Sequence, residues 1–130
     1  MSKLAAIGIV THNMAESLRF YKLLGVETPE PTEDHADATL PNGLRLMWDT
    51  VELIKQIDPE WQEPRGHPMV LAFECDTPEE VDNLHNWVVD SGFASKREPW
   101  DAFWGQRYAQ VVDPDGNVVD LFAPLGESGG

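Results

Sequence analysis

Short apolar runs and amphipathic segments alternate along the chain in a pattern that occurs twice. Residues 4–10 are apolar and end at polar residues, which predicts a strand buried on both faces. Asn13 is placed to cap a following helix, and Glu16 stands at the position that would complete a capping box. Apolar residues then recur at helical spacing to Leu24, and Gly25 follows where helices commonly end. The pattern predicts a strand followed by a helix.

Three further strands and a connecting helix are predicted next. The strands fall at residues 26–28, 36–40 and 44–48. The Pro41-Asn42-Gly43 sequence between the last two predicts a hairpin turn, because Asn and Gly tolerate the positive φ angles that such turns need. A cap at Asp49 or Thr50 predicts a short helix through Ile57 that ends before Pro59.

The same order of elements returns in the second half of the chain. Residues 69–75 predict a strand, Thr77-Pro78-Glu79-Glu80 predicts a helix start, and Ser91-Gly92 predicts its end. The predicted fold is α+β, with two tandem βαβββ modules whose mixed, curved sheets enclose a cleft. The boundaries place module one at residues 3–49, a connector at 50–66, module two at 67–124 and a flexible tail at 125–130, within one domain.

Two sequences carry a family resemblance that covers nearly the whole chain. They are FYKLLGV at residues 20–26 and VDPDGNVVDL at residues 112–121. The sequence at residues 112–121 lies in the second of two matching modules. In that position it resembles the corresponding turn of the vicinal oxygen chelate superfamily, which includes glyoxalases, bleomycin-resistance proteins and extradiol dioxygenases. The resemblance implies the fold but no single function, because this fold supports several chemistries.

Four shorter segments resemble the antibiotic-binding members of that superfamily, including mitomycin-binding and bleomycin-binding proteins. They lie at residues 48–52, 58–62, 99–100 and 104–109. The resemblance implies a homodimer that sequesters a planar drug without modifying it, with pockets between the subunits.

The positions at which metal-dependent members hold their ion can be located by the same resemblance. The two histidine positions fall at Ala6 and Val70, and the carboxylate of module one falls at Leu46 or Met47. Only Asp120, where the family often has Glu, could coordinate a metal, so we predict no metal site and no cofactor. The four histidines of the chain are His12, His35, His67 and His85. All are expected to be solvated or locally hydrogen-bonded. His35 is expected in a loop and His85 on the helix of module two.

Composition narrows the function further. The 23 acidic and 9 basic residues give a formal net charge of −14, which disfavours nucleic acid and anionic membrane surfaces as partners. No apolar run is long enough to span a membrane. The single cysteine, Cys75, cannot form an intrachain disulfide and is expected to be a buried small hydrophobe, and we expect a cytoplasmic protein with no catalytic nucleophile.

Aromatic residues supply the candidate binding site. Five tryptophans in 130 residues is well above ordinary usage, and all but Trp87 fall at predicted strand ends or in loops. Trp87 is expected to pack on the helix of module two. Alternation places the side chains of Trp104, Gln106, Tyr108 and Gln110 on one strand face. The predicted ligand-binding residues are Trp48, Trp61, Trp100, Phe103, Trp104, Gln106, Tyr108 and Asp120. Filling of the sheet core is the alternative role for Trp104 and Tyr108.

Three functions fit these features. We favour metal-independent sequestration of a planar aromatic or quinone-like antibiotic, because indole rings stack on flat conjugated ligands. The alternatives are a metal-dependent glyoxalase- or dioxygenase-type enzyme with an atypical site that includes Asp120, and a binding module for an ordinary metabolite. Dependence on metal separates the first two, and ligand preference separates the third.

Overall fold

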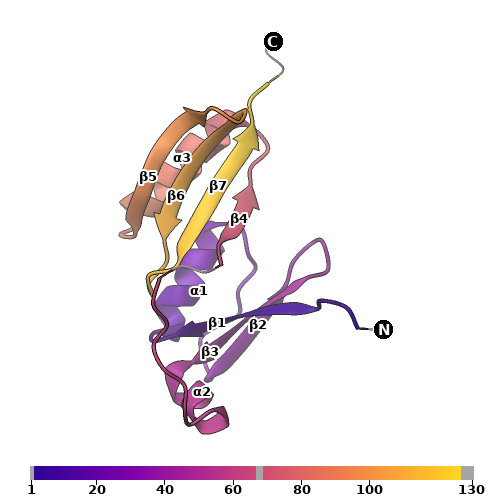
Figure 1. Ribbon diagram of the computed structural model, residues 1–130, viewed down its shortest axis with the longest axis vertical. Coiled ribbons are helices and arrows are strands. Elements are labelled where there is room, and N and C mark those ends of the chain that lie inside the picture. The colour runs from indigo at the N-terminus through magenta and orange to yellow at the C-terminus, as the bar shows by residue number, and fades with distance from the viewer. Residues whose placement is uncertain (1, 67–68, 127–130) are drawn as a thin grey trace. The chain divides into compact units, whose positions relative to one another are not determined.

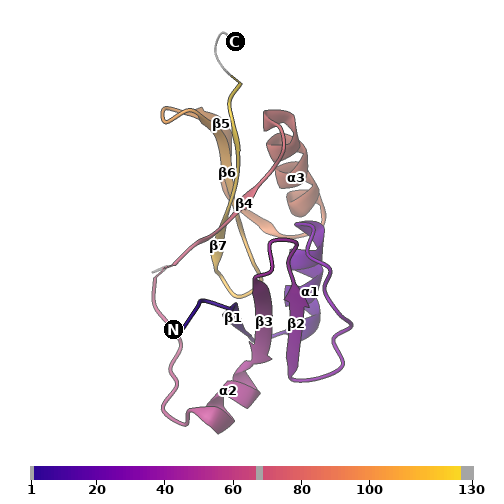
Figure 2. The same cartoon turned by 90° about the vertical axis from the view of Figure 1, so that its right-hand side faces the viewer.

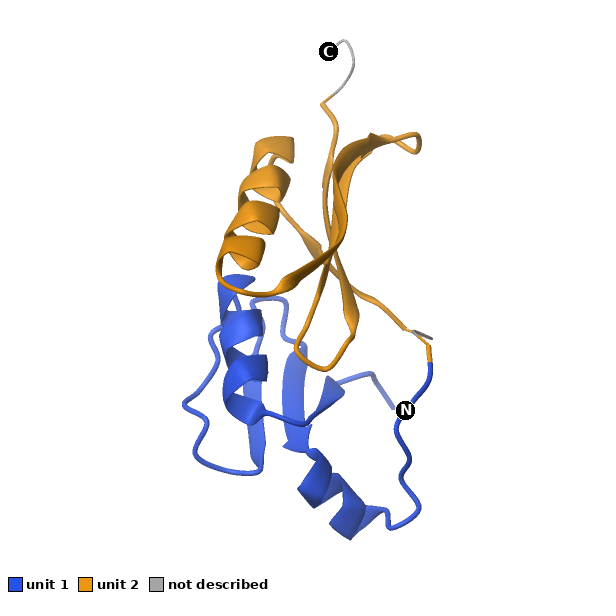
Figure 3. Ribbon diagram, turned by 90° about the vertical axis from the view of Figure 1, so that its left-hand side faces the viewer, with its two compact units in different colours: residues 1–65 blue, residues 66–130 orange. Residues whose placement is uncertain are grey.

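Both halves of the chain contain strands and helices in the computed structural model, which describes residues 2–66 and 69–126 (Figure 1). The elements are β1 (Ala6–Thr11), α1 (Met14–Leu23), β2 (His35–Thr39), β3 (Arg45–Thr50), α2 (Val51–Ile57), β4 (Leu71–Glu74), α3 (Pro78–Asp90), β5 (Ala94–Ala102), β6 (Gln106–Val112) and β7 (Val118–Pro124). They form two units, Met1–Arg65 and Gly66–Gly130 (Figure 3). The α+β class predicted from the sequence is confirmed.

Unit 1 is a three-stranded mixed sheet with order β1-β3-β2, in which β3 pairs parallel with β1 and antiparallel with β2. Its core lies between α1 and the face of β3 that carries Leu46 and Trp48, both of which are buried. The ring of Trp48 lies 5.8 Å from that of Tyr21 on α1, measured between centroids. The hairpin predicted at Asn42-Gly43 is confirmed, and Gly43 adopts a φ of 90°.

One strand predicted for unit 1 does not form, so this unit has a βαββ core followed by α2. Residues 26–28 are irregular in the structure. The N–H of Val26 donates to the carbonyl of Tyr21 and closes the end of α1, and the N–H of Thr28 donates to the carbonyl of Val26. Local bonds therefore occupy the backbone that a strand would have paired, and Pro29 follows with no N–H to offer.

The caps of the first two helices agree in part with those predicted from the sequence. Asn13 caps α1 by accepting a hydrogen bond from the N–H of Glu16, as predicted. The reciprocal bond of a capping box is absent: the N–H of Asn13 donates to the hydroxyl of Thr11, and the carboxylate of Glu16 pairs with Arg19. Thr50 is the N-cap of α2, which ends at Ile57 before Pro59.

Unit 2 is a four-stranded mixed sheet with order β4-β7-β6-β5, and α3 covers one of its faces (Figure 2). Val81 and Val88 of α3 are fully buried, as are Ala109, Val111 and Leu121 of the strands. The βαβββ order predicted for the second module is therefore confirmed. Among the described residues of unit 2, α3 is the only helix, so the opposite face of the sheet has no helix of this unit on it.

The Asp113–Asn117 turn joins β6 to β7 and is held by the side chain of Asp113. One oxygen of this buried carboxylate accepts the backbone N–H groups of Asp115 and Asn117, and the other accepts the side-chain amide of Asn117. Gly116 has a φ of 87°, a conformation that residues with a Cβ rarely adopt.

Two side chains lie where the sequence did not predict them. Trp87 was expected to pack, but 56% of its surface is exposed, because the buried stripe of α3 runs through Val81, His85 and Val88. His35 was expected in a loop, but it is the first residue of β2. None of the helices in residues 2–66 and 69–126 has the length and apolar content that crossing a membrane requires.

Candidate ligand-binding site

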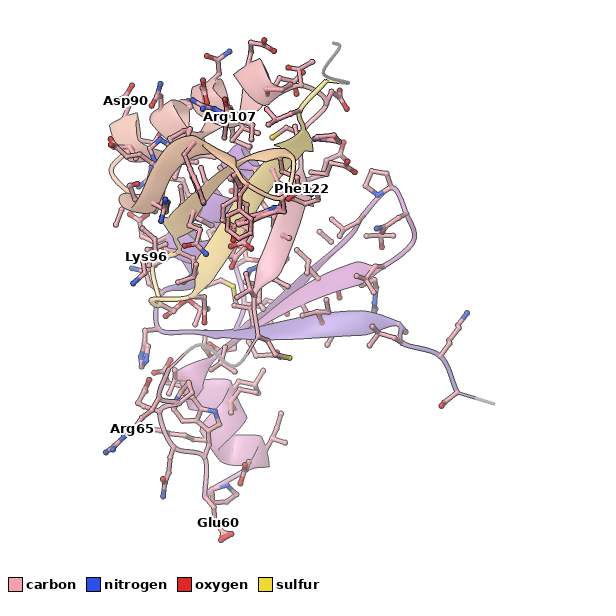
Figure 4. All side chains as sticks on the ribbon, turned by 45° about the horizontal axis from the view of Figure 1, so that its top comes forward. Glu60, Arg65, Asp90, Lys96, Arg107 and Phe122 are labelled. Carbon is pink, nitrogen blue, oxygen red and sulfur yellow. The ribbon has the colours of Figure 1, made fainter. Side chains whose placement is uncertain are left out.

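The two faces of β6 differ sharply in their surroundings. Arg107 points to α3, where its guanidinium donates to both oxygens of Asp82 at 2.8 and 3.2 Å (Figure 4). Ala109 and Val111 on the same face are fully buried. The alternate residues Gln106, Tyr108 and Gln110 are only half-buried. Because strand side chains alternate, this second set lies on the face away from α3, which we call the open face.

Four aromatic side chains gather at the end of the open face where β5 turns into β6. The ring of Trp104 lies 5.6 Å from Trp100, 4.9 Å from Phe103 and 5.2 Å from Tyr108, measured between centroids, and all three pairs are edge-to-face. Trp104 is 47% exposed and Phe103 is 90% exposed. We call these four residues the aromatic cluster. Its exposed rings offer apolar surface that a flat molecule could cover.

A short polar chain continues from the aromatic cluster toward β7. The indole N–H of Trp104 donates to the Gln106 side-chain oxygen at 2.8 Å. The Gln110 amide donates to the Tyr108 hydroxyl at 3.2 Å and to the Asp120 carboxylate at 2.8 Å. Burial raises the pKa of Tyr108 to about 12, and its hydrogen bond to Asp120 acts in the same direction. The phenol is therefore neutral at pH 7 and remains a donor.

Arg97 supplies the one cation in contact with the aromatic cluster among the described residues. The central carbon of its guanidinium lies 4.0 Å from the ring centroid of Trp100. The pairing of β5 with β6 shifts register on either side of Arg97, which indicates a bulge. The indole N–H of Trp100 is buried and has no hydrogen-bond partner in the described part of the chain.

Six of the eight residues predicted for the site are thus in unit 2: Trp100, Phe103, Trp104, Gln106, Tyr108 and Asp120. The other two are in unit 1. Trp48 is fully buried against Tyr21, which corresponds to a packing role, and its indole N–H has no partner among the described residues. Trp61 is half-buried in the segment that follows α2.

Three residues of the open face were absent from the predicted site. Gln110 continues the alternation of β6, so the sequence carried a signal for it. Phe122 lies two residues after Asp120 on β7 and pairs in register with Tyr108, which the same alternation could have indicated (Figure 4). Arg97 had no such signal, because a bulge changes the alternation of β5.

The positions that correspond to the metal ligands of the superfamily do not fit a divalent ion. Ala6, Met47 and Val70 carry no oxygen or nitrogen in their side chains. Leu46, the other candidate in module one, is buried in the core of unit 1. In residues 2–66 and 69–126, no group of three or more His, Cys, Asp or Glu side chains is arranged to hold a metal ion.

Two of the described histidines, His35 and His12, contact carboxylates. His35 contacts Asp49 at 2.6 Å and Asp37 at 3.3 Å, and these carboxylates, Asp49 above all, raise its pKa against the opposing effect of burial. His12 contacts Glu63.

His85 is buried on α3, with its Nε2 atom 2.7 Å from the hydroxyl of Ser95. His67 lies outside the described residues. Cys75 is buried, as expected. Burial is the larger cause that raises the pKa of its thiol, and three nearby carboxylates raise it further.

The family of the chain follows from its sequence. A model of the Glyoxalase/Bleomycin resistance protein/Dioxygenase superfamily matches residues 3–121, and the chain belongs to this superfamily. No functionally curated protein matches the chain.

Solved structures share the fold. A family enzyme from Burkholderia phytofirmans is 20% identical, with a TM-score of 0.83 over 95% of this chain and 100% of that one. A glyoxalase-related enzyme from Fulvimarina pelagi is 22% identical, with a TM-score of 0.82 over 95% of this chain and 88% of that one. A glyoxalase/bleomycin resistance protein/dioxygenase from Nocardioides is 25% identical, with a TM-score of 0.75 over 97% and 85% of the two chains.

Proposed function

We propose that this protein binds a planar aromatic or quinone-like antibiotic, of the mitomycin or bleomycin kind, and holds it without chemical modification. The observation that carries the proposal is the aromatic cluster, in which Trp104 and Phe103 keep exposed ring surface beside half-buried polar groups. Contiguous apolar surface that stays exposed often marks a binding site.

The energetics of the cluster suit a flat ligand. Each aromatic contact contributes about 0.5–1.5 kcal/mol beyond the burial of apolar area. The rings already hold one another edge-to-face, with Trp104 at the centre of three such pairs. Such mutual support limits the side-chain entropy that a ligand would have to remove on binding. Stacking on preformed rings needs no metal and breaks no bond.

Sequestration in the cytoplasm by a homodimer is the biological role that we infer from this binding. The segments at residues 48–52, 58–62, 99–100 and 104–109, which resemble the mitomycin-binding resistance protein, support it. Protection by binding alone is stoichiometric, so a resistant cell would need protein in an amount comparable to the drug.

Tryptophan fluorescence tests the proposal directly. The protein is titrated with mitomycin, with bleomycin and with flat aromatic compounds, each in the presence of chelator and again with added divalent metal. We expect saturable quenching near one ligand per chain that chelator does not change. Trp104→Ala should weaken binding strongly. Trp87→Ala removes an exposed indole from α3, on the other side of the sheet, and serves as the matched control.

The outcomes separate the candidate functions. A response that requires added metal would support a metal-dependent enzyme that uses Asp120, the one residue at a family ligand position with a suitable oxygen. Binding of an ordinary metabolite, with no drug bound, would support a metabolite-binding module. Equal affinity in the Trp104→Ala variant and the unmodified protein would remove the aromatic cluster from the site.

A further inference from the structure

The polar groups around Asp120 have an unequal supply of hydrogen-bond donors and acceptors. The N–H of Trp104 is used by Gln106, and the amide of Gln110 donates to both Tyr108 and Asp120. The Tyr108 hydroxyl is bonded to Asp120. A carboxylate has about four acceptor positions, and these contacts use two of them. Asp120 therefore retains acceptor positions, while the donors bonded to it, on Gln110 and Tyr108, are already occupied.

The aromatic cluster already accepts a planar cation from the chain itself. The guanidinium of Arg97 is flat, delocalised and charged, and it stacks over Trp100 at 4.0 Å. Cations are attracted to the electron-rich face of an indole ring, and this attraction strengthens as water is removed. The Trp100 ring thus provides, within the protein, an example of the contact that a cationic ligand would make.

The negative charge on the open face near β7 also favours a cationic ligand. Ala72 and Glu74 of β4 pair in register with Asp120 and Phe122 of β7, so the Glu74 carboxylate lies on the same face as Asp120. Arg97 is at the opposite edge of the sheet, on β5. The overall charge of −14 adds a long-range attraction for cations at low salt.

We infer that the preferred ligand is a planar aromatic cation, with its ring system on Trp104 and Tyr108 and a positively charged N–H group directed to Asp120. This inference rests on the proposed function, since it specifies the chemistry of the ligand that the aromatic cluster binds. It places ring recognition and charge recognition on different residues, which can be changed separately.

Three flat three-ring probes of different charge test the inference: the diaminoacridine proflavine, a cation at pH 7, neutral acridone, and anionic anthracene-2-carboxylate. Affinities are measured by fluorescence and calorimetry on the whole chain. We expect proflavine to bind about tenfold more tightly than acridone, and the carboxylate to bind most weakly.

The Asp120→Asn variant removes the charge and keeps an oxygen that can accept from Gln110. It should weaken proflavine binding about tenfold and change acridone binding less than about twofold. The Asp90→Asn variant makes the same change in net charge at the last residue of α3 and is the control for long-range attraction (Figure 4). It should leave all three affinities within about twofold.

The results distinguish failure of the preference for a cation from failure of the proposed binding function. If acridone binds the unmodified protein as tightly as proflavine, and Trp104→Ala weakens both, the cluster binds aromatic ligands and the preference for a cation is refuted. If no probe and no drug gives saturable binding, the proposed function itself fails. The comparison of probes on the unmodified chain stands even if a variant does not fold.

Discussion

Replacement of Asp113 by alanine should be among the most destabilising single changes in unit 2. The carboxylate is 4% exposed and accepts three hydrogen bonds, from the backbone N–H groups of Asp115 and Asn117 and from the Asn117 side chain, at 2.8–2.9 Å. These bonds fix the turn that sets β7 against β6. Alanine would remove the acceptor and leave the donors without it.

The size of the loss can be worked from these contacts. A hydrogen bond to a charged group contributes about 1.5–3 kcal/mol, and bonds that share one acceptor are not additive. Water can reach part of the turn in the variant and compensate some donors, since Pro114, Gly116 and Asn117 are exposed. We therefore expect Asp113→Ala to lower the free energy of unfolding by about 3 kcal/mol, a large share of the 5–15 kcal/mol typical of a domain.

Urea unfolding followed by tryptophan fluorescence measures this loss. Asp76→Ala is the control, because Asp76 is exposed and should change stability by less than about 0.5 kcal/mol. Asp113→Asn, which keeps one acceptor oxygen, should fall between the two. A loss below about 1 kcal/mol for Asp113→Ala would show that the turn is held by other contacts and would refute the argument.

Three other predictions concern single contacts. Since the carboxylate of Asp49 raises the pKa of His35, their pairing should stabilise the fold fully below pH 6.5 and less as pH rises through the raised pKa. In the Asp49→Asn variant, the stability measured by urea unfolding should lose much of this pH dependence. An unchanged pH profile would contradict the pairing. Titration of Tyr108 by NMR should give a pKa of about 12 that falls, but stays above the ordinary value, in Asp120→Asn, because burial is the larger cause; a value near 10 in the unmodified protein would contradict the burial. Gly116→Ala should cost about 1 kcal/mol in urea unfolding because φ is 87°, and an unchanged midpoint would show that the turn can rearrange.

Local chemistry determined much of the fold in advance. The Asn-Gly hairpin and the caps at Asn13, Thr50 and Thr77 are properties of a few adjacent residues, and each is present in the structure. The superfamily was also recognisable from sequence, because its DPDG turn carries the hydrogen bonds that Asp113 makes. The strand predicted at residues 26–28 failed because local bonds occupy its backbone: one joins Val26 to the end of α1, and one joins Thr28 to Val26.

Tertiary structure decided which aromatic residues are accessible. Trp48 lies on β3 and is fully buried, and Trp87 lies on α3 with 56% of its surface exposed. Trp104, which the alternation placed on a strand face, lies in the turn between β5 and β6 and is 47% exposed. Alternation divides β6 into two faces but does not say which face a helix will cover, and the packing of α3 makes that choice.

The partner of Trp100 was decided in the same way. A bulge in β5 brings Arg97 over its ring, and no periodic pattern encodes a bulge. The sequence alone determined the elements other than the strand at residues 26–28, the turns and the family, since these depend on neighbours along the chain. The accessible rings and the charges beside them depend on neighbours in space, and only the folded sheet and its helix bring those together.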